Sequence, residues 1–177
     1  MRTLLLLSFL LLTLSVSAQQ SVDNADLFAK VTRERYSLNY PKSWIIDTSK
    51  MFGMDIIIRS PKTDSLDDFI ENMNVFFQDL HGMNYTLSKM GKEGEDQIKN
   101  MVTDVEIIDS RLDSTISPQN YILKYRGRQG KFLLTTIQHY YLKDEVGYAL
   151  TMTIKKEESQ DYILDADKIF DSFRIRQ

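Results

Sequence analysis

The chain of 177 residues contains no cysteine, only two histidines and only three prolines. Without cysteine it can form no disulfide, no thiolate nucleophile and no cysteine-based zinc site. Positive charge is not in excess either, because 22 Lys and Arg stand against 25 Asp and Glu, for a net charge of −3. Nucleic-acid binding rewards concentrated positive charge. The composition therefore excludes cysteine chemistry and disfavours a nucleic-acid partner.

Long apolar runs are scarce as well. One such run, Leu4–Leu14, follows Arg2 and precedes the small residues of Val16–Ala18. It is shorter than the roughly 20 apolar residues that span a bilayer, and this order of segments is typical of a cleaved signal peptide. We therefore expect residues 1–18 to be removed on export, which predicts a periplasmic or secreted protein.

The rest of the chain shows no repeat, no low-complexity tract and no linker long enough to divide it. Its first segment, residues 19–34, is short and largely polar at its start, and we expect it to be a flexible N-terminus of the mature protein. Residues 35–177 have the usual size of one domain. The sequence therefore predicts a single domain over residues 35–177.

Three segments form the expected core of this domain: Gln119–Arg126, Lys131–Tyr141 and Val146–Ile154. They are rich in the β-branched and aromatic residues that fit a half-buried pleated surface. The separators between them are short enough for hairpins and too short for a crossover. In the third segment, residues 146, 148, 150, 152 and 154 place apolar side chains on one face. The sequence therefore predicts an antiparallel meander.

Two helices and several shorter strands surround the meander. Strands are expected at residues 35–40, 44–46, 54–60, 71–80, 105–111 and, as a short edge strand, 172–176. A helix over 85–102 is predicted, with Thr86 as its N-cap. Its apolar stripe consists of Leu87, Met90, Gly94, Ile98 and Met101. A final helix from residue 159 carries a wide apolar face suited to lie on a sheet, and Trp44 is expected to fill the core.

Two short motifs resemble those of a known family. Tyr36–Trp44 (YSLNYPKSW) is similar to the opening motif of PsbP-like proteins, and Ile169–Arg174 (IFDSFR) resembles their closing helix end. The strands and the helix between the motifs follow in the family's order. The resemblance implies an α/β/α sandwich, with a mainly antiparallel sheet and helices on both faces. It also implies binding or assembly roles, and it supplies no catalytic residues.

The two histidines and a group of acids are the candidates for metal binding. His139 lies within a strand pattern and is expected to be a surface or hydrogen-bonded packing residue, whereas a zinc site with His81 would require the two to converge. The densest acids are Asp64, Asp67, Asp68 and Glu71. They lack the calcium-loop pattern of alternating oxygen ligands with a turn glycine. We expect a solvated acidic loop, and we expect no metal or other cofactor.

A basic cluster marks one hairpin of the predicted meander. It consists of Lys124, Arg126, Arg128 and Lys131. Such a hairpin tip could contact an acidic partner or a lipid headgroup. The alternative is a solvated turn whose charges protect the strand edges.

Three hypotheses for function follow. The first is an exported, non-catalytic binding or assembly module that docks onto an envelope partner, since no nucleophile and base appear in a known catalytic motif. The second is a periplasmic small-ligand or metal-binding protein with a pocket between the helix at 85–102 and the sheet. The third is a hydrolase with dispersed acids, which a concave site with titratable groups would support.

Overall fold

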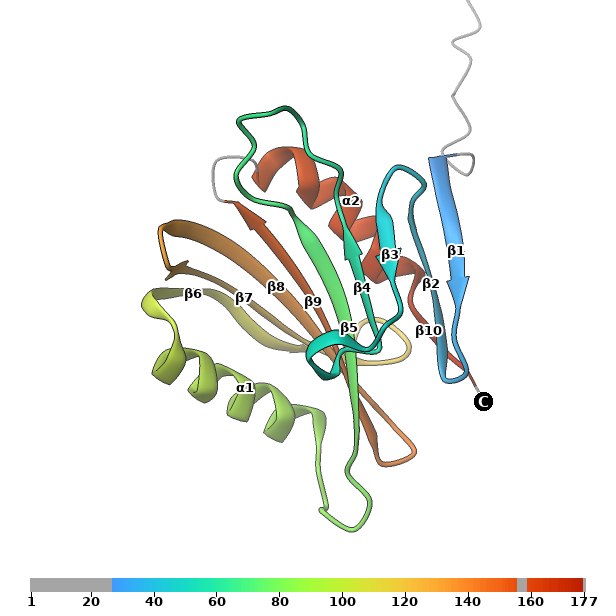
Figure 1. Cartoon of the computed structure of the whole chain (residues 1–177). Coiled ribbons are helices and arrows are strands. Elements are labelled where there is room, and N and C mark those ends of the chain that lie inside the picture. Colours follow the sequence, from blue (N-terminus) through green and yellow to red (C-terminus); the bar gives the residue numbers. More distant parts are fainter. Residues whose placement is uncertain (1–26, 156–158, 177) are drawn as a thin grey trace, which may run out of the picture.

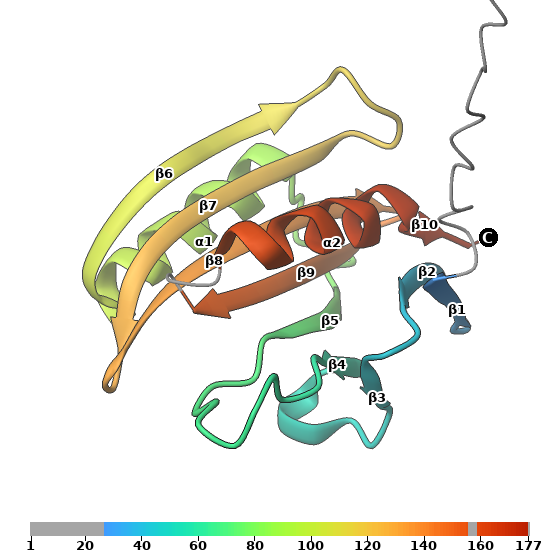
Figure 2. The same cartoon turned by 90° about the horizontal axis from the view of Figure 1, so that it is seen from above.

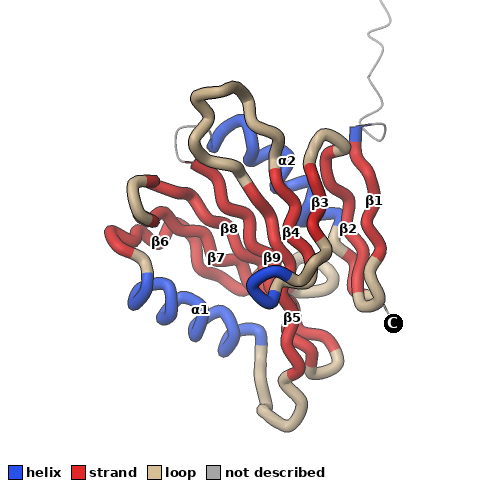
Figure 3. The backbone as a smooth tube through the Cα atoms, viewed as in Figure 1, coloured by secondary structure: helices blue, strands red, loops and turns tan. Residues whose placement is uncertain are grey.

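The computed structural model describes residues 27–155 and 159–176, so the expected signal peptide at 1–18 lies outside the described residues. Two helices and a set of strands make up this part of the chain (Figures 1 and 3). In chain order the elements are β1 (Phe28–Thr32), β2 (Tyr36–Pro41), β3 (Ile45–Asp47), the short 3₁₀ turn η2 (Met51–Gly53), β4 (Ile56–Arg59), β5 (Asn72–Asp79), α1 (Leu87–Met101), β6 (Thr103–Asp113), β7 (Asn120–Gln129), β8 (Phe132–Lys143), β9 (Val146–Lys155), α2 (Ser159–Ser172) and β10 (Arg174–Ile175).

The main sheet has seven strands in the order β3-β4-β5-β9-β8-β7-β6. Every neighbouring pair in it is antiparallel. The predicted meander is confirmed as β7, β8 and β9, and β5 completes the centre of the sheet by pairing with β9. The chain crosses from β5 to the far edge at β6 through α1 (Figure 1).

The two helices cover opposite faces of this sheet. Successive side chains of a strand point to opposite faces, and on β8 Tyr140 lies against Gly94 of α1, whereas Tyr141 contacts Phe173 at the end of α2. Figures 1 and 2 show α1 beside β6–β8 and α2 along β9. The α/β/α arrangement with a mainly antiparallel sheet is therefore confirmed.

The hydrophobic core lies between the main sheet and α2. The alternating apolar face of β9 points into it, as predicted, and Leu150, Met152 and Ile154 are fully buried there. Trp44 is only 5% exposed and its ring meets the ring of Tyr162 on α2 edge-on. The single tryptophan is thus a core residue, as expected.

A second sheet corrects one prediction. Residues 28–32, expected in a flexible N-terminus, form β1, which pairs with β2 along its whole length. The strand expected at 35–40 is confirmed as β2, and it belongs to a three-stranded sheet of order β1-β2-β10. A period of two residues identifies a strand and does not choose its partner, so the sequence pattern could not separate the two sheets.

A polar cluster ties the small sheet to the main one. Arg33 Nε donates to Asp55 Oδ2 at 2.9 Å, and Tyr36 Oη donates to the same oxygen at 2.7 Å. Burial alone would raise the pKa of Asp55, but the hydrogen bonds from Arg33 and Tyr36 outweigh burial and lower it. The carboxylate is therefore held ionised immediately before β4.

The glycines of α1 are positions of close approach. A Cβ atom built on Gly91 would lie 2.2 Å from a ring carbon of Tyr121, and one on Gly94 would lie 2.4 Å from the Tyr140 hydroxyl. The helix therefore rests directly on the two tyrosine rings. Thr86 is confirmed as the N-cap, because its hydroxyl accepts from Lys89 N at 3.1 Å. Met101, predicted to lie on the apolar stripe, is 73% exposed and does not contribute to this contact.

Candidate functional site

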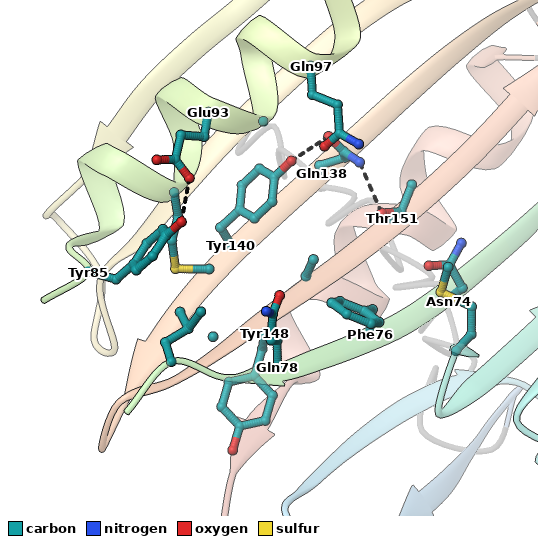
Figure 4. A pocket seen from close by; sticks show the side chains of 16 residues that line it. Asn74, Phe76, Gln78, Tyr85, Glu93, Gln97, Gln138, Tyr140, Tyr148 and Thr151 are labelled. Carbon is teal, nitrogen blue, oxygen red and sulfur yellow. Dashed lines mark hydrogen bonds between the residues drawn. The ribbon is translucent and has the colours of Figure 1, made fainter. Parts of the chain in front are cut away.

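The α1 side of the main sheet is only partly covered. The helix packs mainly on β6, β7 and β8, which leaves β9 and β5 accessible on this side. The β9 residues pointing there are small: Gly147, Ala149 and Thr151. The neighbouring strands carry larger side chains on this face, so the small side chains of β9 leave a groove of about 410 Å³ between them (Figure 4).

One wall of the groove is a row of alternate residues on β5. Asn74, Phe76 and Gln78 lie opposite Thr151, Ala149 and Gly147 respectively in the antiparallel register. Phe76 lies between the two carboxamides (Figure 4) and remains 37% exposed. The opposite wall comes from β8 and α1 and includes Gln138, Tyr140, Met90, Glu93 and Gln97.

Hydrogen bonds fix the polar groups on the second wall. Tyr140 Oη donates to Gln138 Oε1 at 2.8 Å, and Gln138 Nε2 donates to Thr151 Oγ1 at 3.2 Å (Figure 4). At the groove end, Tyr85 Oη donates to Glu93 Oε2 at 2.7 Å. Burial raises the pKa of Tyr140, so its phenol stays protonated. Among the described lining residues only Glu93 carries a formal charge, and the wall therefore offers fixed, mostly neutral donors and acceptors.

This arrangement offers mainly neutral hydrogen-bonding groups. The groove presents carboxamides, hydroxyls and aromatic rings, and the one carboxylate among its described lining residues, that of Glu93, accepts a hydrogen bond from Tyr85. The groove lies between the predicted 85–102 helix and the sheet, which is where the small-ligand hypothesis expected a pocket.

The two histidines occupy different surroundings. His81 is exposed, and its Nδ1 lies 2.5 Å from Glu145 Oε2. His139 stacks on Phe170 of α2, with ring centroids 4.0 Å apart, and its Nδ1 lies 3.0 Å from Asn120 Nδ2. The stacking and the amide contact bear out the prediction of a hydrogen-bonded packing residue. Within residues 27–155 and 159–176, no three His, Asp or Glu side chains are grouped as metal ligands.

His139 borders a second, smaller hollow of about 200 Å³ at the end of α2. Burial lowers the pKa of His139 to about 4; the positive charge of Arg111 adds to this effect, and Asp113 opposes it. An amide nitrogen only donates, so the contact with Asn120 also requires Nδ1 to accept and favours the neutral ring. The hollow therefore holds an uncharged imidazole at neutral pH.

The acidic loop is organised by its own backbone and by lysines. Asp64 Oδ1 accepts from Leu66 N at 2.7 Å, and Asp67 Oδ2 accepts from Thr63 N at 2.9 Å. Asp68 pairs with Lys131, in the turn between β7 and β8, and with Lys155 at the end of β9, and Glu71 is fully buried. These carboxylates close turns and hold the loop against the sheet.

The basic residues singled out in the sequence lie along β7 and in the turn after it, and three of the four pair with acids. Arg126 Nη1 lies 3.6 Å from Glu106 Oε2, and Arg128 Nε lies 3.4 Å from Asp104 Oδ2. Lys131 pairs with Asp68 at 2.5 Å, and Lys124 stands opposite Asp109 in the register. They are not part of the groove. Their predicted role as partner contacts stays a prediction.

Neither edge of the main sheet presents a regular template for an added strand. The outer strand β6 shows two register shifts against β7, and Asp104 within it has a positive φ of 52°. At the other edge β3 has only three residues. Bulges, charges and short length are features that protect sheet edges from pairing. The groove is therefore a better candidate site than either edge.

The groove was only partly visible in the sequence. The pattern in 146–154 predicted that Gly147, Ala149 and Thr151 share one face. It gave no sign that this face would be left uncovered. The signal that could have indicated a site was the alternation Asn74–Phe76–Gln78, in which carboxamides flank an aromatic ring on the side of a central strand that faces away from the core.

Comparisons with known proteins identify the fold. No known family model and no curated protein sequence matches the chain. Cyanobacterial PsbP (CyanoP) from Synechocystis sp. PCC 6803 is similar in structure, with a TM-score of 0.64 and 15% identity over 84% of this chain and 92% of that chain. LpqN of Mycobacterium tuberculosis, described as involved in cell envelope biogenesis, has a TM-score of 0.61 and 11% identity, over 85% and 92%.

A third similar structure is PA94 of Pseudomonas aeruginosa, described as a putative regulator of unknown function. Its TM-score is 0.60, with 10% identity over 85% of this chain and 98% of that chain. At such identities the likeness concerns the fold and not the activity. It confirms the resemblance that the opening and closing motifs predicted: the chain has the PsbP-like fold.

Proposed function

We propose that the protein is an exported, non-catalytic binding or assembly module that docks onto a partner in the cell envelope through the groove beside α1. The observation that supports this function is the uncovered stretch of sheet between β5 and β8, floored by the small residues of β9 and lined by fixed neutral polar groups. A preformed hollow with a few placed polar groups is the usual form of a binding site.

Two further observations agree with an envelope location. The order of residues in the leader at 1–18 is typical of export, and one protein of similar fold, LpqN, is described as involved in cell envelope biogenesis. Neither helix in the described part of the chain is long and apolar enough to cross a membrane.

Site-specific photo-crosslinking tests this proposal. The full chain would carry p-benzoylphenylalanine in place of Gln97, an exposed residue of the groove wall, or in place of Glu34, an exposed residue outside it. After irradiation of intact cells, the envelope fraction is analysed by mass spectrometry. We expect an envelope adduct from position 97 that position 34 does not give and that Ala149→Phe, which fills the groove floor, abolishes.

Identical adducts from both positions, or an adduct that Ala149→Phe leaves unchanged, would refute docking through the groove. The basic residues of β7 and its turn are proposed as a second contact with an acidic partner. Replacing Arg128 and Lys131 with Glu should then weaken the adduct at position 97, and an undiminished adduct would remove that surface from the proposal.

The alternative is a periplasmic small-ligand-binding protein. The groove volume of about 410 Å³ favours it, since small-molecule sites measure roughly 300–1,000 Å³. Binding of a metal is the weaker half of that alternative, because the residues that the structure describes contain no group of potential metal ligands.

A further inference from the structure

We propose that the groove beside α1 binds a neutral saccharide, as a free sugar or as a unit of an envelope glycan. This inference rests on the function proposed above and names the chemistry of the ligand. It follows from the charge of the lining, from the kind of hydrogen-bonding groups in it and from the aromatic ring placed among them.

The charge of the lining excludes most ionic ligands. None of the described lining residues is a Lys, an Arg or a His, so a phosphate, sulfate or carboxylate would be desolvated without a counter-charge. The one acid, Glu93, accepts a hydrogen bond from Tyr85, and Lys89 lies 4.3 Å above the ring of that tyrosine. Any complement to a positively charged ligand is therefore confined to this one carboxylate at the groove end. The rest of the lining fits a neutral polar ligand.

The hydrogen-bonding groups match hydroxyl groups. Four carboxamides line the groove: Asn74, Gln78, Gln97 and Gln138. A carboxamide presents a donor and an acceptor side by side, and each sugar hydroxyl is both. Gln138 is already oriented by Tyr140 and Thr151, whereas the side chains of Asn74 and Gln78 form no hydrogen bond within the described part of the chain and can meet a ligand. Alternate residues of a strand lie about 7 Å apart, so each of these two can reach the rim of a ring centred on Phe76.

The aromatic ring supplies the apolar half of the site. Phe76 is a large apolar side chain in the centre of the main sheet, yet it is 37% exposed and faces Ala149 across the strands. The hydrophobic core lies on the other face of β5, and Phe76 is not part of it. A pyranose has an apolar face of C–H groups between its hydroxyls, so it can cover Phe76 while its rim reaches the carboxamides. Burying an aromatic side chain contributes substantially to binding.

An extended peptide is the main competitor, because carboxamides also bind peptide groups. Peptides that add to sheets do so at an edge, where backbone groups provide the hydrogen bonds. Here the site lies on a sheet face whose backbone is paired on both sides through β8 and β5. Only side chains are offered, and a compact ligand with hydroxyls around its rim uses them better than a peptide does.

Binding of defined oligosaccharides to the purified full chain tests the proposal. Maltotriose, cellotriose and chitotriose would be screened by saturation-transfer NMR, and any that bind would be titrated by calorimetry. We expect at least one to bind. Phe76→Ala should weaken it about tenfold or more and Asn74→Ala less strongly, whereas Ala149→Phe should abolish it. Phe52→Ala is the matched control, because Phe52 is 85% exposed and does not line the groove.

The outcomes separate this inference from the proposed function. If no sugar binds, or if Phe76→Ala and Ala149→Phe leave binding within about twofold of wild type, the saccharide inference is overturned. A groove-dependent adduct to a polypeptide, with no sugar bound, would overturn it while leaving the docking function intact. Sugar binding that depends on the groove, together with crosslinks that do not depend on it, would support the saccharide inference and overturn docking through the groove. Thermal melting of each variant identifies any loss of binding that reflects unfolding.

Discussion

The half-buried imidazole of His139, which stacks on Phe170, should make the protein lose stability in mild acid. In the unfolded chain a histidine has a pKa of about 6.5, whereas burial lowers the pKa of His139 in the folded chain to about 4. Between pH 6.5 and pH 4, His139 is therefore protonated in the unfolded chain and mostly neutral in the folded chain, which favours unfolding. The stability is unaffected above pH 6.5 and falls progressively as the pH drops towards 4. At pH 4 the loss amounts to about 3 kcal/mol.

Replacing His139 with Gln removes the titrating group. Urea unfolding at pH 7 and at pH 4.5 can be followed through the fluorescence of Trp44, the single tryptophan, which is buried against α2. Wild type should lose about 2–3 kcal/mol more between these pH values than His139→Gln does. The variant also loses the stacking on Phe170, but it loses it at both pH values, so the difference between them isolates the proton.

His81→Gln is the comparison variant, because it removes the other of the two histidines, which lies exposed beside Glu145. The pH dependence of stability should change less in this variant than in His139→Gln. Equal losses in wild type and in His139→Gln would refute the reasoning, because they would show that His139 is protonated without penalty in the folded chain and is not enclosed between the sheet and α2.

Two further substitutions test the packing. Gly91→Ala should lower the melting temperature, because the new methyl group would overlap the Tyr121 ring and overpacking costs about 1–3 kcal/mol. This cost opposes a helix-propensity gain of about 1 kcal/mol. Ser88→Ala, at an exposed position of the same helix, is the control, and an equal rise in melting temperature in both variants would contradict the close contact. Asp55→Asn should lower the free energy of unfolding by about 1.5–3 kcal/mol at pH 7. Because the pKa of Asp55 is lowered, this deficit should shrink below about pH 4, the range in which the unfolded carboxyl titrates, and a constant deficit from pH 7 to 3 would argue against an ionised carboxylate.

Much of the fold could be predicted because it depends on neighbours in the chain. The period of two in 146–154 and the short turns on either side of 131–141 are enough to define the meander. The sequence pattern does not indicate which partner a strand pairs with. Residues 35–40 carry the alternation of a strand, yet they pair with 28–32 and with 174–175 in a separate sheet.

The glycines of α1 show the same limit at the level of single residues. In the sequence Gly91 and Gly94 only weaken a helix. In the folded chain they lie against Tyr121 and Tyr140, which come from strands far along the sequence. The same contact fixes how much of the sheet α1 covers, and so it decides that the small residues of β9 become the floor of a groove.

The sequence by itself determined the kinds of elements, their faces and the absence of cysteine chemistry, because these depend on residue type and local period. Only the tertiary structure decided which strands share a sheet, that His139 is enclosed against Phe170, and that the row of Asn74, Phe76 and Gln78 is left open to a ligand. The reason is physical: alternation places a side chain on one face of a strand, but whether that face is covered depends on packing between segments distant in the chain.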